Sequence, residues 1–296
     1  MAKSVLRCQP VKNPKLLQAD LSLLFITLIW GGSFTIVKLS LAQASPILFI
    51  CLRFWVAAVV TAAFMPRAFA NLPFQTLKRG LILSIALLGG FVFQTVGLRG
   101  TTPSRSAFIT SLSVLLVPVL GFFLFHHRPR IRTLLGVGMA TVGLGLLTLN
   151  AIPIKLTQGD FLTLICAVVF ALHILLIGRY LPTSDFRQLV LLQLCGSALL
   201  CTLILPMLET PFLVWDFTIA VYLFVTGVLA TGLAIYVQNR AQQYTTPNRT
   251  ALIFSLEPFF AALIAYQILG QSLSPKEWAG GALVLAGILT SEFRRG

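Results

Sequence analysis

The stretch that decides the fold occurs twice, as TTPSRSAFITSL at residues 101–112 and as TTPNRTALIFSL at residues 245–256. The two copies lie 144 positions apart and share eight of their twelve residues. The same offset pairs Gln94 with Gln238 and Gly136 with Gly280. Apolar sequence seldom repeats a Thr-Thr-Pro-x-Arg motif by chance, so the chain is predicted to be an internal duplication.

Around this repeat, the composition is that of a membrane protein. The 296 residues are 57% hydrophobic and only 10% charged, with a mean hydropathy of +0.92, whereas soluble domains carry roughly 25% charged residues. Apolar runs of about 20 residues recur, which is the length that crosses a hydrocarbon core ~30 Å thick. The sequence therefore predicts an all-α integral membrane protein without a soluble domain.

Charged residues and prolines divide the chain into ten predicted transmembrane helices. They cover residues 21–40, 46–65, 81–98, 106–125, 133–150, 161–179, 188–208, 218–237, 250–269 and 277–291. Each copy of the repeat then holds five spans, an odd number, so the second copy must enter the membrane from the opposite side. We expect two inverted-topology five-helix repeats, at residues 21–150 and 160–291, after a basic head at residues 1–20. Inverted repeats of this kind are typical of secondary transporters.

The distribution of Lys and Arg predicts the orientation. With the N-terminus inside, the inner segments hold 16 of these residues and the outer loops hold four. Because cytoplasmic loops carry the excess of positive charge, both termini of this multi-pass protein are predicted to face the cytoplasm, across the cytoplasmic (inner) membrane. The net charge of +14 then reflects topology, and no nucleic-acid partner is expected.

Several short motifs, taken in order, resemble the drug/metabolite transporter (DMT) superfamily in its ten-span EamA type, which has two EamA domains. These motifs are Trp30–Phe34 with Lys38, Leu52–Phe54, Gln94–Leu98 leading into Thr101–Pro103, Gly159–Asp160, Glu257–Pro258 and Trp278–Gly280. The resemblance implies a small-metabolite carrier with a central cavity, often an exporter of amino acids or related solutes. One departure concerns the ends of the fourth and ninth spans, where the family often has Glu after Gly. Here Gln271 follows Gly270, and His126 and His127 occupy the equivalent site.

Three ionisable side chains lie well inside predicted spans, where a charge costs at least ~2.5–3.5 kcal/mol on insertion scales. Glu257 could bind an ammonium group or a proton during transport, or it could pair with Arg or cap a helix that Pro258 disturbs. Arg53 could hold a substrate carboxylate or act as a static countercharge. His173 could be a titrating relay or a neutral, hydrogen-bonded core residue.

A set of polar and aromatic side chains in spans one, three, four and eight is predicted to line a wet cavity, although each one alone could simply join helices. The set comprises Trp30, Ser33, Gln94, Ser111, Ser113, Tyr236 and Gln238. The predicted substrate-binding residues are this set without Ser113, together with Arg53 and Glu257. Pro118 and Pro258 interrupt the fourth and ninth spans, and we expect kinks there that serve as hinges or gates. Glu257, Pro118, Pro258 and His173 are thus the candidates for coupling or gating.

The expected function is alternating-access transport of a small solute such as an amino acid across the lipid bilayer. A passive facilitator with the same fold is the alternative, since the difference is kinetic. An intramembrane enzyme is a remote alternative, because the sequence has no H-E-x-x-H motif and no pair of intramembrane aspartates, and Asp160 is expected to be a helix N-cap. No cofactor or metal is expected: there is no Walker A motif, and the five cysteines have no metal-ligand spacing. The oligomeric state stays open.

Overall fold

The computed structural model describes residues 14–126, 129–148, 156–269 and 274–292. Within these ranges the regular elements are helices, apart from one isolated bridge between Ala44 and Leu213. The predicted all-α membrane fold is therefore confirmed. Most of the predicted basic head lies outside the described residues, and its last part is helical because the first helix already begins at Pro14.

The first half is built from α1 to α6. Its elements are α1 (Pro14–Ser40), α2 (Pro46–Phe64), η1 (Pro66–Phe69), α3 (Phe74–Arg99), α4 (Pro103–Ser111), α5 (Ser113–Phe125) and α6 (Ile131–Thr148). The second half has α7 (Gln158–Tyr180), η2 (Leu181–Thr183), α8 (Phe186–Leu208), α9 (Phe217–Phe224), the π-helical η3 (Val225–Leu233), α10 (Ala234–Gln242), α11 (Pro247–Phe254), α12 (Glu257–Leu269) and α13 (Pro275–Glu292).

These elements account for the ten predicted spans. Seven helical stretches are long and apolar enough to cross a membrane by length and composition, and shorter apolar helices cover Ile131–Leu146 and Trp278–Thr290. The remaining span is α11 followed by α12, which are separated by Ser255 and Leu256. An interruption at Leu112 separates α4 from α5 at the equivalent position of the first half.

The first two helices of each half correspond at a different offset, 140 positions, from that of the sequence motif. Along both helix pairs, residues 140 positions apart are buried together. Along α1 and α7 such pairs are Leu23 and Thr163, Ser33 and His173, Phe34 and Ile174, and Val37 and Ile177. Along α2 and α8 they are Ile50 and Val190, Arg53 and Gln193, and Phe54 and Leu194. The two halves therefore bury equivalent faces, although the residues on those faces differ.

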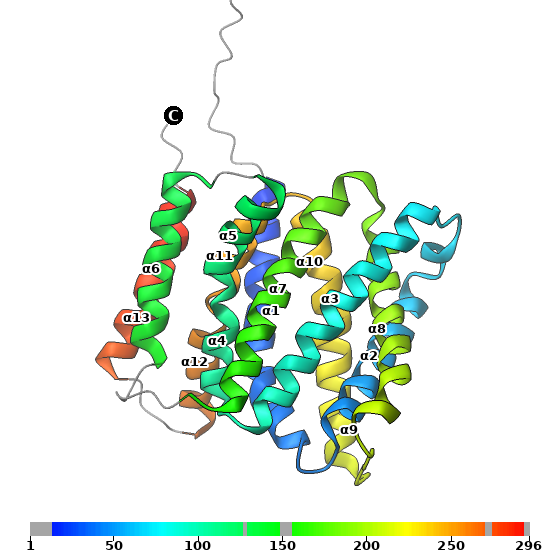
Figure 1. Cartoon of the computed structure of the whole chain (residues 1–296). Helices are drawn as coiled ribbons and strands as arrows, with labels where there is room; N and C mark the ends of the chain where they lie inside the picture. Colours follow the sequence, from blue (N-terminus) through cyan, green and yellow to red (C-terminus); the bar gives the residue numbers. More distant parts are fainter. Residues whose placement is uncertain (1–13, 127–128, 149–155, 270–273, 293–296) are drawn as a thin grey trace, which may run out of the picture.

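The arrangement in space agrees with an inverted duplication. Figure 1 shows α1 and α7 running in opposite directions, while α1 begins and α13 ends on the same side of the molecule. Helices α6 and α13 pack along each other at one edge (Figure 1). Gly143 lies against the carbonyl oxygen of Gly280, and Gly287 lies reciprocally against that of Gly136. Small residues at such crossings let helix backbones approach closely.

Candidate functional site

A small cavity lies between the two halves and collects most of the residues that the sequence singled out. Its volume is about 60 Å³, which is room for a few water molecules and far below the ~300–1,000 Å³ of ordinary ligand pockets. The predicted residues in its wall are Trp30, Ser33, Arg53, Gln94, Ser111, Ser113, His173, Gln238 and Glu257. The molecule must therefore widen around this cavity to hold an organic solute.

The wall of the cavity follows the internal duplication. Paired lining residues are Phe91 and Ile235, Gln94 and Gln238, Thr110 and Phe254, and Ser113 and Glu257 at the offset of 144, with Trp30 and Phe170, Ser33 and His173, and Phe34 and Ile174 at 140. The cavity thus has an approximate two-fold arrangement. The two sides of the cavity differ chemically where the paired residues differ, above all at Ser113 and Glu257 and at Ser33 and His173.

Glu257 is a buried glutamate in the wall of this cavity. It is the first residue of α12, directly after the interruption at Ser255 and Leu256, and it is only 6% exposed. Among the described residues, none forms a hydrogen bond or an ion pair with its side chain, and Arg53 does not pair with it. Backbone packing at this site is tight, because Gly31 of α1 lies against the Glu257 carbonyl oxygen.

Arg53 is buried and anchored to the opposite half. Its Nε donates to Thr231 Oγ1 at 2.5 Å, its Nη2 donates to Ala230 O at 3.3 Å, and its guanidinium lies 4.4 Å from the centre of the Phe91 ring. Thr231 and Ala230 belong to the π-helical η3, an unusual geometry that recurs at functional sites. Trp30 Nε1 donates to the same Ala230 carbonyl at 2.8 Å. A cation and an indole from the first half are therefore fixed by one irregular turn of the second.

Two predictions about the site need correction. Tyr236 lies outside the cavity, in a separate cleft of about 560 Å³ that Arg67 and Arg187 also line. The cause is helical periodicity, because Ile235 and Gln238 share the face of α10 toward the cavity and Tyr236 is rotated about 100° from Ile235. Its ring instead packs beside Phe186.

Of the two prolines that are predicted to interrupt their spans, only Pro258 lies at an interruption. Helix α5 continues through Pro118, and the interruption of the fourth span lies six residues earlier, at Leu112. Pro258 is the second residue of α12, directly after the interruption of the ninth span. A proline is tolerated in a first turn because the amide that it lacks has no helical partner there.

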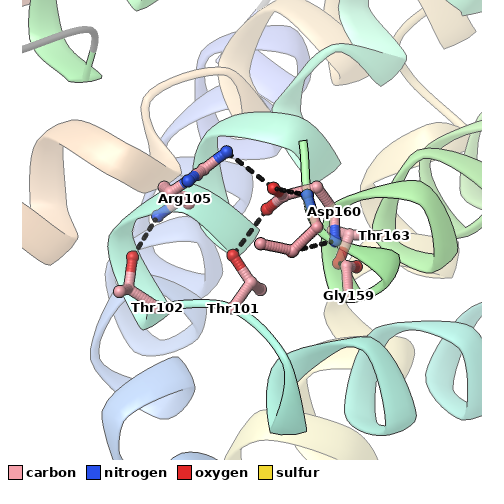
Figure 2. Close-up of polar contacts among 7 residues, drawn as sticks. Thr101, Thr102, Arg105, Gly159, Asp160 and Thr163 are labelled. Carbon is pink, nitrogen blue, oxygen red and sulfur yellow. Dashed lines mark hydrogen bonds and ion pairs between the residues drawn. The ribbon is translucent and has the colours of Figure 1, made fainter. Parts of the chain in front are cut away.

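An ion pair that the sequence did not predict joins the halves at the start of α7. Arg105 Nη2 lies 2.6 Å from Asp160 Oδ2, and Thr101 Oγ1 donates to Asp160 Oδ1 at 2.6 Å (Figure 2). The expectation that Asp160 is the N-cap is wrong. The cap is Thr157, and Asp160 completes its capping box from three residues later.

An equivalent ion pair joins the halves at the start of α1. Arg249 Nε donates to Asp20 Oδ1 at 2.8 Å, and Arg249 Nη2 also pairs with Asp20 Oδ2. Because α1 and α7 begin on opposite sides of the molecule (Figure 1), the two ion pairs lie on opposite sides as well. The sequence held the signal, since Asp20 and Asp160 are 140 positions apart and the two arginines are 144 apart.

Comparisons with known proteins agree with this architecture. The model of the EamA-like transporter family matches residues 17–149 and again residues 157–292. An uncharacterized transporter of Archaeoglobus fulgidus is 32% identical over 95% of this chain and 87% of its own length. A protein of Salmonella typhimurium named a probable amino-acid metabolite efflux pump is 26% identical over 91% of this chain and 93% of its own. A solved crystal structure superposes with a TM-score of 0.76 and 18% identity, covering 93% of this chain and 96% of that one, which shows a shared fold.

Proposed function

This chain belongs to the EamA-like transporter family, and we propose that it exports small amino-acid-like metabolites by alternating access to the central cavity. The efflux name of the Salmonella relative supports this substrate class. The bias of Lys and Arg supports an orientation with both termini in the cytoplasm. In that orientation the ion pair of Arg249 with Asp20 lies on the cytoplasmic side, and that of Arg105 with Asp160 lies on the outer side.

The observation that carries the proposal is the presence of one acidic and one basic side chain in the wall of the same cavity. Glu257 offers a carboxyl group that has no hydrogen-bonded or ionic partner in the described part of the chain, and Arg53 offers a guanidinium that is already fixed in place by Thr231 and Ala230. A zwitterion presents the complementary charges, because its ammonium group suits Glu257 and its carboxylate suits Arg53. Trp30 and Phe91 supply apolar walls for the remainder of the solute.

The two ion pairs support alternating access. Each joins the start of the fourth span of one half to the first helix of the other, and both are formed in this conformation. In our proposal the conformation with both ion pairs formed is the intermediate that is closed to both sides. Each open state breaks one ion pair and keeps the other. Because the halves are near-equivalent, the outward-open and inward-open states have similar free energies, as a carrier requires.

Exchange by the purified protein in liposomes tests this function. We expect saturable counterflow of labelled amino acids, which Glu257→Gln lowers at least tenfold, because a hydrogen bond to a charged group contributes about 1.5–3 kcal/mol. The control is Glu209→Gln, which changes a glutamate outside the cavity that accepts from the Leu48 amide. Wild-type exchange by folded Glu257→Gln protein would refute the role of this carboxylate.

An imposed proton gradient separates the carrier from the passive facilitator. Uphill flux driven by protons would establish coupling and make Glu257 the first residue to test as the proton site. Flux that only equilibrates, with acceleration by solute on the far side, would establish a facilitator in which Glu257 binds solute. No flux of any amino acid would contradict the proposed substrate class.

A further inference from the structure

Three helices of the second half share a buried chain of polar side chains beside the cavity. His173 Nε2 lies 2.8 Å from Gln193 Oε1, and Gln193 Nε2 donates to Asn239 Oδ1 at 3.3 Å. Asn239 Nδ2 in turn donates to Ile235 O at 2.8 Å. All three side chains are almost fully buried, and of the three only His173 reaches the cavity wall.

The end of this chain fixes the direction of every hydrogen bond in it. Ile235 O is a backbone carbonyl and can only accept, so the Asn239 amide nitrogen must face it and the Asn239 oxygen must face Gln193. The Gln193 nitrogen is then the donor to Asn239, and its oxygen faces His173. His173 Nε2 must therefore carry a hydrogen, and in the neutral ring Nδ1 holds a free lone pair.

That lone pair is available to the cavity. No hydrogen bond or ion pair among the described residues engages His173 Nδ1, and His173 is one of the residues that line the cavity. Nδ1 and the Glu257 carboxyl group are thus two acceptors of the cavity wall, beside the amide and hydroxyl oxygens that also line it, whereas Arg53 already uses its Nε and Nη2 within the protein.

The first half shows that the fold does not need this chain. Ser33, the counterpart of His173, donates to Trp30 O within its own helix at 2.9 Å. Thr95, the counterpart of Asn239, is buried, and among the described residues nothing bonds to its hydroxyl. Arg53, the counterpart of Gln193, bonds across to Thr231 and Ala230 instead. The equivalent positions of the first half therefore pack without a hydrogen-bonded chain among themselves, which argues that the chain in the second half serves the solute rather than stability.

We propose that His173 is a specificity-determining residue that accepts a hydrogen bond, beside Glu257, from the ammonium group of the solute. Gln193 and Asn239 are positioning residues that hold its ring with Nδ1 toward the cavity. This role deepens the proposed function and rests on it, because the solute is the amino-acid-like metabolite proposed above. The site should therefore bind amines that carry N–H hydrogens in preference to quaternary ammonium groups, which have the charge but no hydrogen-bond donor.

Nitrogen NMR of the full-length protein tests the ring directly. With His126 and His127 replaced by Gln, ¹⁵N-labelled His173 is the only histidine. We expect one hydrogen, on Nε2, and a shift of the Nδ1 signal on addition of methylammonium but not of tetramethylammonium. Gln193→Leu should mix the two tautomers, whereas Thr95→Val, at the counterpart of Asn239, should leave the spectrum unchanged. A hydrogen on Nδ1 in the folded protein, or equal shifts with both cations, would overturn the proposal.

Exchange in liposomes gives the second readout. The wild type should exchange leucine at least tenfold faster than its N,N,N-trimethyl derivative, and Gln193→Leu and Asn239→Thr should reduce that preference about tenfold. Equal preference in the wild type and these variants would overturn the role of His173. Absence of all amino-acid flux, with the NMR result intact, would instead overturn the proposed function and leave the ammonium site standing.

Discussion

Glu257 and Ser113 occupy the same position in the two halves and face the same cavity, but only one of them can carry a charge. The same holds for His173 against Ser33. A duplicated protein can thus keep a symmetric backbone and still bind an asymmetric solute, because a few substitutions decide which half contacts which end of it.

Trp30 illustrates a residue that links the halves through one bond. Its Nε1 donates to Ala230 O, while its ring packs edge-on against Phe254 at 4.8 Å between centroids. We predict that Trp30→Phe keeps the ring contact and lowers the free energy of unfolding by about 1 kcal/mol, because a partly buried hydrogen bond is lost.

Thermal unfolding in detergent measures this effect, and Trp55→Phe is the matched control. Trp55 Nε1 also donates a hydrogen bond, to Thr202 Oγ1, but Trp55 is 38% exposed at the periphery. The control should lose less stability than Trp30→Phe. Equal losses would show that the link to η3 adds nothing.

At the residue level, the sequence predicted which residues line the cavity better than it predicted their hydrogen bonds and ion pairs. Rarity in apolar sequence was enough to single out Arg53, His173 and Glu257. It could not show that Arg53 is held by a π-helical turn, since the wide turn depends on packing against α1 and α2. It also missed the Asp20 and Asp160 ion pairs, because acids near span ends look like ordinary caps.

The fourth and ninth spans are the elements that break, and they break at the same place. Leu112 and Leu256 lie in the interruptions, 144 positions apart, each one residue before a side chain of the cavity wall. The sequence predicted the kink of the fourth span at Pro118. The breaks of both spans lie instead at equivalent positions of the repeated motif. The breaks therefore place Ser113 and Glu257 at the first turns of two helices.

Gly31 permits α1 to lie against the second of these breaks. A Cβ at Gly31 would meet the Glu257 carbonyl and the Ala261 amide, whereas a Cβ at Gly32 would meet only the end of the Ile264 side chain. We predict that Gly31→Ala displaces the start of α12 and lowers exchange in liposomes severalfold more than Gly32→Ala does. Similar rates for the two variants would show that this close approach is dispensable.

The crossing of α6 with α13 gives a second test at this scale. Gly143→Ala and Gly287→Ala should each destabilise the protein by about 1–3 kcal/mol, because the added methyl group would meet backbone of the partner helix. Gly138→Ala is the control within α6, since no atom of the described residues lies within 4 Å of its Cβ position, and it should be neutral or slightly stabilising. Thermal unfolding compares the three, and equal behaviour would argue against the tight crossing.

For the whole molecule, the inverted architecture was predictable from the repeated motif and an odd number of spans. The offset of 140 in the first two helices of each half was not, because those helices share a pattern of burial rather than residue identity. That second offset aligns Asp20 with Asp160 and makes the two ion pairs equivalent. Each links one half to the other on its own side of the molecule.

The most direct test of alternating access measures how the cavity is reached from each side. In a cysteine-free protein, Ser33→Cys places one thiol in the cavity wall, and membrane-impermeant reagents can be applied from either face. We predict that Arg105→Ala shifts labelling toward the outer face and Arg249→Ala toward the cytoplasmic face, because each removes the ion pair that closes its side. Exchanging the charges, with Arg105→Asp and Asp160→Arg together, should restore the wild-type ratio. The same inner-to-outer ratio in both alanine variants would contradict the account.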